Sequence, residues 1–170
     1  MKSENVCGKI RKKEDNYETI RTCEKWLFLI SNAGNSDALF EEVYGLLYSE
    51  GYVKKEFLAE VKKRERNYPT GLQMGNNNIA LPHVDACYVQ KNALVICKLK
   101  RPIKFKRMDE NSQEIEVKIV FFLIISDVSV HVDTISSLTK VWQCENIMNQ
   151  FNVIETKQEL MDCFLANGIN

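Results

Sequence analysis

The chain has 170 residues, 45% hydrophobic and 27% charged, and this balance is typical of a globular domain. Lys plus Arg and Asp plus Glu number 23 each, so the basic excess of a nucleic-acid-binding protein is missing and we expect no nucleic-acid partner. The longest apolar run, which contains residues 120–125, is far shorter than the roughly 20 residues that cross a bilayer. We therefore expect no direct membrane insertion.

The N-terminal part of the chain differs in composition from the rest. Residues 1–22 are polar and mixed in charge, which predicts a loosely attached extension ahead of one domain at residues 23–170. No apolar stretch in the extension resembles a signal peptide, so we expect a cytoplasmic protein. The six cysteines form no C-x-x-C pair, which favours reduced, mostly buried thiols over a zinc site or a redox dithiol.

The first part of the predicted domain is a strand followed by a helix. Residues 26–30 (WLFLI) form a short continuous apolar run, typical of a buried strand. A turn cluster follows, and we expect Ser36 or Asp37 to cap a helix over residues 38–50. Gly51 ends this helix.

The middle of the chain predicts a second helix, a loop and strands. The pattern KKEFLAEVKKRE at residues 54–65 is amphipathic and predicts the helix. A loop rich in Gly and Asn leads into IALPHVDA at residues 79–86. Residues 92–105 alternate as a half-buried strand does, with Pro102 expected at an edge or a break, and residues 116–126 form a central strand that is apolar on both faces.

Two further helices are predicted after the central strand. Ile135, Leu138, Val141 and Trp142 lie at helical spacing, and residues 160–165 carry the stripe of a last helix. The predicted order is β, α, α, β, β, β, α, α. A central strand that is apolar on both faces needs helices on both sides, so the predicted fold is α/β (α+β), with a single mixed β-sheet sandwiched between helices.

His83 is one of only two histidines in the chain, and it directly follows a proline. Pro82 fixes its own φ and pushes Leu81 toward extended geometry, so the imidazole is carried by a stiff backbone. If one ring nitrogen donates to a carbonyl, the other is free as a base or nucleophile. The residues alone leave open whether His83 is such a nucleophile or a structural or surface histidine.

His131 is the second histidine, and we expect it to precede a helix that starts near Val132 or Asp133. The unpaired N–H groups of a helix start attract anions, so His131 could help to hold a phosphate there. The alternative is a histidine at a helix start with no role in chemistry.

Other constellations are weaker. His83, Asp85, Cys87 and His131 could form a metal site, and Cys87 could be the nucleophile of a Cys/His hydrolase. No Gly-x-x-x-x-Gly-Lys loop is present, so nucleotide chemistry of the P-loop kind is not expected. The basic run KKRER is more typical of a solvated helix face, although Arg64 or Arg66 could meet an anion. We expect no cofactor and no metal.

The segment RERNYPTGL, followed after a short gap by NNIALPHVD, resembles the phosphorylation-site signature of the fructose–mannitol (type 2) enzyme IIA proteins. These proteins belong to the phosphoenolpyruvate-dependent sugar phosphotransferase system, and the resemblance extends from about Trp26 to the end of the chain. The YPTG run is similar to the galactitol branch. Asn78 stands where many members have glycine, and Val84 and Asp85 stand where many have a small residue or threonine.

The resemblance implies a type-2 EIIA fold and a phosphohistidine relay. His83 would be the phosphoryl acceptor, His131 the second active-site histidine that stabilises the phosphoryl group, and Arg64 a supporting charge. The partners it implies are HPr as donor, an enzyme IIB cysteine as acceptor and, indirectly, a membrane IIC transporter. Leu72, Met74 and Leu81 are candidates for the docking surface.

Two roles fit this resemblance. One is uptake of a sugar or alditol, with a galactitol-like substrate. The other is a regulatory EIIA-like protein whose phosphorylation state controls a transporter or a transcription factor. The sequence does not define the oligomeric state.

Overall fold

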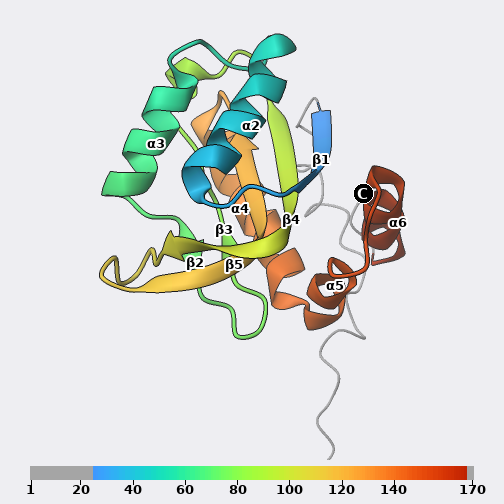
Figure 1. The fold of residues 1–170 in the computed structure, drawn as a ribbon. Coiled ribbons are helices and arrows are strands. Elements are labelled where there is room, and N and C mark those ends of the chain that lie inside the picture. Colours follow the sequence, from blue (N-terminus) through green and yellow to red (C-terminus); the bar gives the residue numbers. More distant parts are fainter. Residues whose placement is uncertain (1–24, 168–170) are drawn as a thin grey trace, which may run out of the picture.

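The computed structural model describes residues 25–167, which form a mixed sheet with helices on both faces (Figure 1). The strands are β1 (Lys25–Ser31), β2 (Gly71–Leu72), β3 (Ile79–Ala80), β4 (Ala93–Lys106) and β5 (Glu114–Ile124). The helices are α2 (Ser36–Ser49), α3 (Phe57–Asn67), α4 (Val128–Gln143), α5 (Glu145–Gln150) and α6 (Lys157–Ala166), with a 3-10 turn, η3, at Ala86–Tyr88. The predicted fold class is confirmed. None of these helices combines the length and the apolar character needed to cross a membrane.

The strand order in the sheet is β1-β4-β5-β3-β2. β4 pairs with β1 in parallel and with β5 antiparallel, while β3 pairs with β5 in parallel and with β2 antiparallel. The short strand β3 therefore lies beside β5 rather than beside β4, which follows it in sequence. This crossover determines which loops meet at the edge of the sheet.

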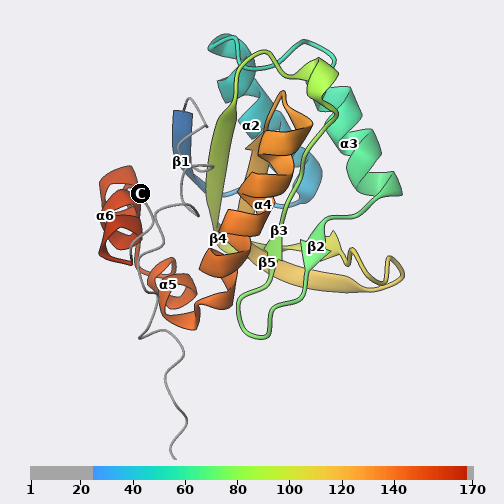
Figure 2. The same cartoon turned by 180° about the vertical axis from the view of Figure 1, so that it is seen from behind.

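Alternating side chains on β4 and β5 build a separate core on each face of the sheet. Leu94 and Ile96 of β4 pack on one face with Phe121 and Leu123 of β5, against helices α4, α5 and α6. The intervening residues of both strands pack on the other face against α2 and α3. Figure 2 shows α4 and α5 covering the face opposite to α2 and α3. Two-sided burial is the physical reason that β5 reads as a continuous apolar run.

The helix starts differ from the sequence predictions. Asn35, rather than Ser36 or Asp37, caps α2, because its side chain accepts the Ala38 N–H at 2.9 Å. Helix α4 begins at Val128, four residues before the predicted start at Val132. Its cap is the carboxylate of Asp127.

Sequence patterns alone also missed short elements. The strand β2, the turn η3 and the helix α5 were not predicted, because each is too short to show a period of its own. Pro102 was expected at an edge or a break, and the register between β4 and β5 shifts between Lys98 and Ile103. The predicted N-terminal extension at residues 1–22 lies outside the described residues.

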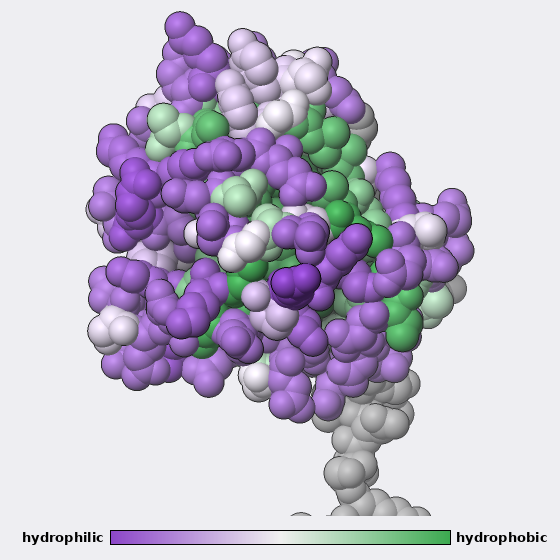
Figure 3. All heavy atoms as spheres, in the orientation of Figure 1, coloured by the Kyte–Doolittle hydropathy of each residue, from purple (hydrophilic) through white to green (hydrophobic). Residues whose placement is uncertain are grey.

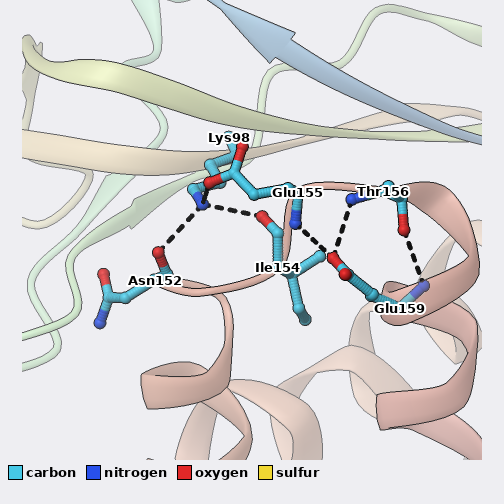
Figure 4. A network of polar contacts seen from close by, with 6 residues as sticks. All are labelled: Lys98, Asn152, Ile154, Glu155, Thr156 and Glu159. Carbon is cyan, nitrogen blue, oxygen red and sulfur yellow. Dashed lines mark hydrogen bonds and ion pairs between the residues drawn. The ribbon is translucent and has the colours of Figure 1, made fainter.

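Lys98 ties the C-terminal helices to the sheet (Figure 4). Its ammonium group donates to the backbone carbonyls of Asn152 and Ile154 at 3.0 and 2.7 Å, and to the Glu155 carboxylate at 2.7 Å. The chain then enters α6 through a capping box formed by Thr156 and Glu159. This network fixes the segment between α5 and α6 to the middle of β4.

Figure 3 shows the face of α2 and α3 as mainly hydrophilic, with more hydrophobic residues toward the edge where β1 lies. Residues 26–30 of β1 are half-buried, in keeping with a strand at the edge of the sheet. The prediction of a buried strand is therefore correct in kind, although burial along it is incomplete.

Candidate active site

His83 lies just beyond the end of β3, where the chain continues alongside β5. The Leu123 N–H donates to the Pro82 carbonyl at 3.2 Å, and His83 forms an isolated parallel bridge with Leu123. Pro82 and Val84 are buried, so the backbone on both sides of the histidine is anchored in the fold. The ring itself is half-buried, as expected for a group that must meet a partner from a stiff support.

The two ring nitrogens of His83 have different partners. Nδ1 lies 2.8 Å from the Leu81 carbonyl oxygen, and Nε2 lies 2.7 Å from Nη2 of Arg64. A carbonyl can only accept and a guanidinium can only donate, so the partners assign the proton to Nδ1 and the lone pair to Nε2. The neutral imidazole thus presents Nε2 as its nucleophilic atom.

His131 meets His83 because β3 and β5 are parallel neighbours whose carboxyl ends share one edge of the sheet. His83 follows β3, and His131 lies in the first turns of α4, which follows β5. The ring centroids are 4.8 Å apart at an angle of 75°. Nε2 of His131 is buried and has no hydrogen-bond partner within residues 25–167, so a donor or acceptor position remains free beside His83.

The start of α4 is not the open anion site that the sequence suggested. Asp127 Oδ1 accepts the N–H groups of Ser129 and Val130 at 2.7 and 3.4 Å. The backbone N–H of His131 donates to the Asp127 carbonyl at 3.0 Å. A carboxylate therefore already occupies the helix tip, and side chains supply the positive charge of the site.

Arg64 reaches the site from the last turn of α3. Besides the contact with His83, its Nη1 lies 3.6 Å from the Asp85 carboxylate, and its guanidinium lies 6.0 Å from the centre of the Tyr68 ring. Its Nε is buried with no partner among the residues that the structure describes. Arg66 is exposed and lies in a different pocket, beside Lys104 and Glu114, so the structure brings Arg64 to the histidines and not Arg66.

Burial decides the protonation of both histidines. It lowers the pKa of His83 to about 4, the hydrogen bond to the Leu81 carbonyl opposes this shift, and the charge of Arg64 adds to it. Burial, followed by the charge of Arg64, also lowers the pKa of His131. Both rings are therefore held neutral, which keeps the Nε2 lone pair of His83 available.

A pocket of about 650 Å³ opens beside His83. One wall comes from the end of α3 and the following loop, and the other comes from the loop between β4 and β5, a part of the site that no sequence motif had indicated. The lining residues are Arg64, Asn67, Tyr68, Pro69, Thr70, His83, Met108, Asp109, Glu110 and Asn111.

The predicted docking residues are only partly suited to that role. Leu81 is 3% exposed and packs in the core with α4, so its prediction as a docking residue is wrong. Leu72 and Met74 are half-buried against the same core. The large apolar side chains exposed near the site are instead Tyr68 at 70% and Met108 at 50%, which line the pocket.

The metal and thiol alternatives find no support in the geometry. Across residues 25–167, no group of three or more His, Cys, Asp or Glu side chains is arranged to hold a metal ion. Cys87 is exposed, and Cys97 and Cys163 are buried free thiols. Arg64, and not a cysteine, is the group in contact with Nε2 of His83.

A family model described as "Phosphoenolpyruvate-dependent sugar phosphotransferase system, EIIA 2" matches residues 22–167. The chain belongs to this EIIA family. The resemblance predicted from the RERNYPTGL and NNIALPHVD segments is thereby confirmed.

Curated relatives of this EIIA chain include a regulator and a transport component. The transcriptional regulator ManR of Bacillus subtilis is 28% identical over 96 residues, which are 56% of this chain and 14% of ManR. The galactitol-specific EIIA component of Escherichia coli K12 is 24% identical over 81 residues, which are 48% of this chain and 53% of that protein. The match thus spans about half of the galactitol component and a small part of ManR.

Solved structures show the same EIIA fold. The mannitol IIA in complex with phosphorylated mannitol IIB from Escherichia coli superposes with a TM-score of 0.66 at 20% identity, covering 82% of this chain and 94% of that one. The nitrogen regulatory protein IIA-Ntr from Neisseria meningitidis superposes with a TM-score of 0.65 at 21% identity, covering 81% and 91%. At these identities the likeness establishes the fold.

Proposed function

We propose that this EIIA chain is a phosphohistidine carrier in which Nε2 of His83 accepts a phosphoryl group from phospho-HPr. The observation that carries the proposal is the contact at Nε2, where a neutral imidazole nitrogen faces a guanidinium at 2.7 Å beside an open pocket. Nδ1 is held on the Leu81 carbonyl, which leaves Nε2 as the attacking atom.

The transfer is a displacement at phosphorus. The Nε2 lone pair forms the new N–P bond, the N–P bond of the donor breaks, and the donor imidazole leaves with that electron pair. The proton stays on Nδ1 of His83, which keeps donating it to the Leu81 carbonyl. The donor imidazole likewise keeps the proton on its other ring nitrogen and leaves as a neutral ring, so no proton has to move. Arg64 exchanges its contact with Nε2 for the phosphoryl oxygens, and the neighbouring His131 ring offers its unpartnered Nε2 to the same group. The transition state of phosphoryl transfer is loose, so this chemistry needs mainly positioning and charge stabilisation.

The phosphoramidate then passes its phosphoryl group to a cysteine of an enzyme IIB, which serves uptake through a membrane IIC transporter. A galactitol-like alditol is the proposed substrate class, supported by the galactitol-specific relative and by the YPTG run. In this proposal the chain acts in the cytoplasm, with residues 23–170 as the EIIA domain and residues 1–22 as an extension.

A phosphotransfer assay tests the acceptor. The chain is incubated with phosphoenolpyruvate, enzyme I and HPr, and its intact mass is measured before and after acid treatment. We expect one acid-labile phosphoryl adduct that disappears in His83→Ala and persists, formed more slowly, in His131→Ala. An adduct that survives in His83→Ala, or the lack of any adduct on the folded wild-type chain, would refute the proposal.

A regulatory role is the second candidate, favoured by the match to the transcriptional regulator ManR. In this role phosphorylation of His83 changes the affinity for a transporter or a transcription factor. Pull-downs with the phosphorylated chain and with His83→Ala separate the two roles. A partner that prefers one state supports regulation, whereas discharge of the phosphoryl group to a galactitol-type IIB supports transport.

A further inference from the structure

Arg64 and Glu65 are adjacent in the last turn of α3, and each contacts a different segment of the site, Arg64 the one after β3 and Glu65 the one before β2. Arg64 donates to Nε2 of the imidazole. The carboxylate of Glu65 accepts both the backbone N–H of Thr70 at 3.0 Å and its hydroxyl at 2.7 Å. Glu65 is half-buried, and it has no role in the phosphoryl transfer proposed above.

Two further hydrogen bonds connect Thr70 to the imidazole. The Thr70 carbonyl accepts the N–H of Leu81 at 3.2 Å, and the Leu81 carbonyl accepts Nδ1–H of His83 at 2.8 Å. Thr70 is 2% exposed and Leu81 is 3% exposed, so water does not readily replace these partners. A continuous series of hydrogen bonds therefore runs from the Glu65 carboxylate to the ring nitrogen opposite the nucleophile.

We propose that Glu65 is a positioning residue for the phosphoryl acceptor, fixing Thr70 and Leu81 so that the Leu81 carbonyl holds Nδ1–H of His83 and leaves the lone pair on Nε2. The proposal rests on the proposed function of His83 as acceptor. Arg64 and Glu65 then hold the two sides of one imidazole from one helix turn, Arg64 directly and Glu65 through the backbone.

The surroundings of Glu65 support a positional role. Pro69 has no N–H, and the Tyr68 N–H donates to the Arg64 carbonyl at 2.7 Å. Among the described residues, the hydrogen bonds of Glu65 therefore connect Thr70 to α3. Burial raises the pKa of Glu65 to about 7, against the opposing effect of its hydrogen bonds with Thr70. Removing a carboxyl group from water costs stability, and such groups with shifted pKa values are typical of functional sites, where side chains are held in a defined geometry.

Glu65→Gln is the first test, because the amide keeps the shape but offers one accepting oxygen to two donors. Thr70→Val removes the hydroxyl donor, and Thr70→Ser keeps it as the conservative rescue. Glu60→Gln is the matched control, since Glu60 lies on the same helix and pairs with Lys63 near the surface, at 3.5 Å. The tautomer of His83 is read from ¹⁵N chemical shifts, without any phosphoryl donor, and phosphorylation kinetics follow.

We expect Glu65→Gln and Thr70→Val to increase the Nε2–H tautomer of His83 and to lower kcat for phosphorylation by about tenfold or more, with KM for HPr changed less than about twofold. Thr70→Ser and Glu60→Gln should match the wild type. An unchanged tautomer and kcat in folded Glu65→Gln or Thr70→Val, with only a lower melting temperature, would overturn the proposal. A wild-type chain that shows the Nδ1–H tautomer but accepts no phosphoryl group would refute the proposed function. A change of tautomer in Glu65→Gln would then support only the hold of Glu65 on the His83 ring, and not its role in positioning an acceptor.

Discussion

His83 and Glu65 are both half-buried titratable side chains, and burial moves their pKa values in opposite directions. The pKa of His83 falls from 6.5 to about 4, and that of Glu65 rises from 4.5 to about 7. The cause is the same, because burial penalises the charged form, which is the acid form of histidine and the base form of glutamate. Burial therefore favours the neutral form of both side chains, on either side of the Arg64 guanidinium that contacts His83.

These shifts predict how stability depends on pH. His83 contributes stability that is present above pH 6.5 and is lost as the pH falls through about 4. Glu65 contributes stability that is present below pH 4.5 and is lost as the pH rises through about 7. Between pH 4.5 and 6.5 the two effects oppose each other and partly cancel in the wild type.

Single variants should separate these opposing effects. The quantity to compare is the free energy of unfolding of the variant minus that of the wild type. For Glu65→Gln this difference should rise by about 2 kcal/mol between pH 4.5 and 7. For His83→Gln it should fall by a similar amount between pH 4 and 6.5. Urea denaturation across this range measures both. Glu60→Gln serves as the control, and its difference from the wild type should not change with pH. A difference that is equally independent of pH in Glu65→Gln or His83→Gln would contradict the pKa shift of that residue.

At the scale of elements, two helices and one strand determine the site. The last turn of α3 supplies Arg64 and Glu65, the residues after β3 supply His83, and the first turns of α4 supply His131. The Asp127 side chain accepts the N–H groups of Ser129 and Val130 at the start of α4, so Nε2 of the His131 ring, and not the helix start, is the group left without a partner among the described residues. The helices α5 and α6 stay away from this edge and complete the core.

The link between β4 and the C-terminal helices gives an element-scale prediction. The Lys98 side chain is only 13% exposed and donates to two carbonyls and a carboxylate. Lys98→Met should lower the free energy of unfolding by about 1–3 kcal/mol, because the carbonyl of the buried residue Ile154 loses its donor. Hydrogen exchange should rise first in α5 and α6.

Lys100→Met is the matched control, since Lys100 lies on the same strand and is exposed. It should leave both stability and exchange unchanged. Equal destabilisation by the two variants would show that the loss of charge on β4, and not the network in Figure 4, is responsible.

At the scale of the whole molecule, the active-site segment is held by a close backbone approach at Gly71. A Cβ at this position would lie 2.5 Å from the Lys106 carbonyl oxygen, and the Gly71 carbonyl accepts the Met108 N–H at 2.8 Å. The loop after α3 is thereby packed against the end of β4, where the second wall of the pocket begins. Glycine is required here for space, since its neighbour is backbone that cannot rotate away.

Gly71→Ala should therefore lower the free energy of unfolding by about 2 kcal/mol or more, because backbone must shift to relieve the overlap. Gly45→Ala is the control with the opposite expected sign. Gly45 lies inside α2, where a methyl group would meet no atom within 4 Å, and alanine in a helix interior is favoured by about 0.5–1 kcal/mol. Urea denaturation measures both, and a neutral Gly71→Ala would contradict the close approach.

Local sequence patterns were enough to predict the layered architecture of this protein and its two candidate histidines. The two-sided apolar run at residues 116–126 is a local pattern that requires a sheet with helices on both faces, and the structure has that sheet. The half-buried strand predicted at residues 92–105 is wrong for residues 93–97, which are all buried because β4 lies between β1 and β5. His83 stood out because Pro82 restrains the backbone before it. These properties are encoded within a few residues, where propensity and burial pattern act directly.

The contacts between segments distant in the chain follow from the three-dimensional fold. The distance of 4.8 Å between the histidine rings depends on β3 pairing with β5, which are separated by β4 in the chain. The same strand pairing buries Leu81 in the core rather than exposing it to a partner. It also brings the loop between β4 and β5 to the pocket, where that loop forms one wall. Pairing between strands distant in sequence is selected by the total burial of the fold, and no short stretch of the chain carries that information.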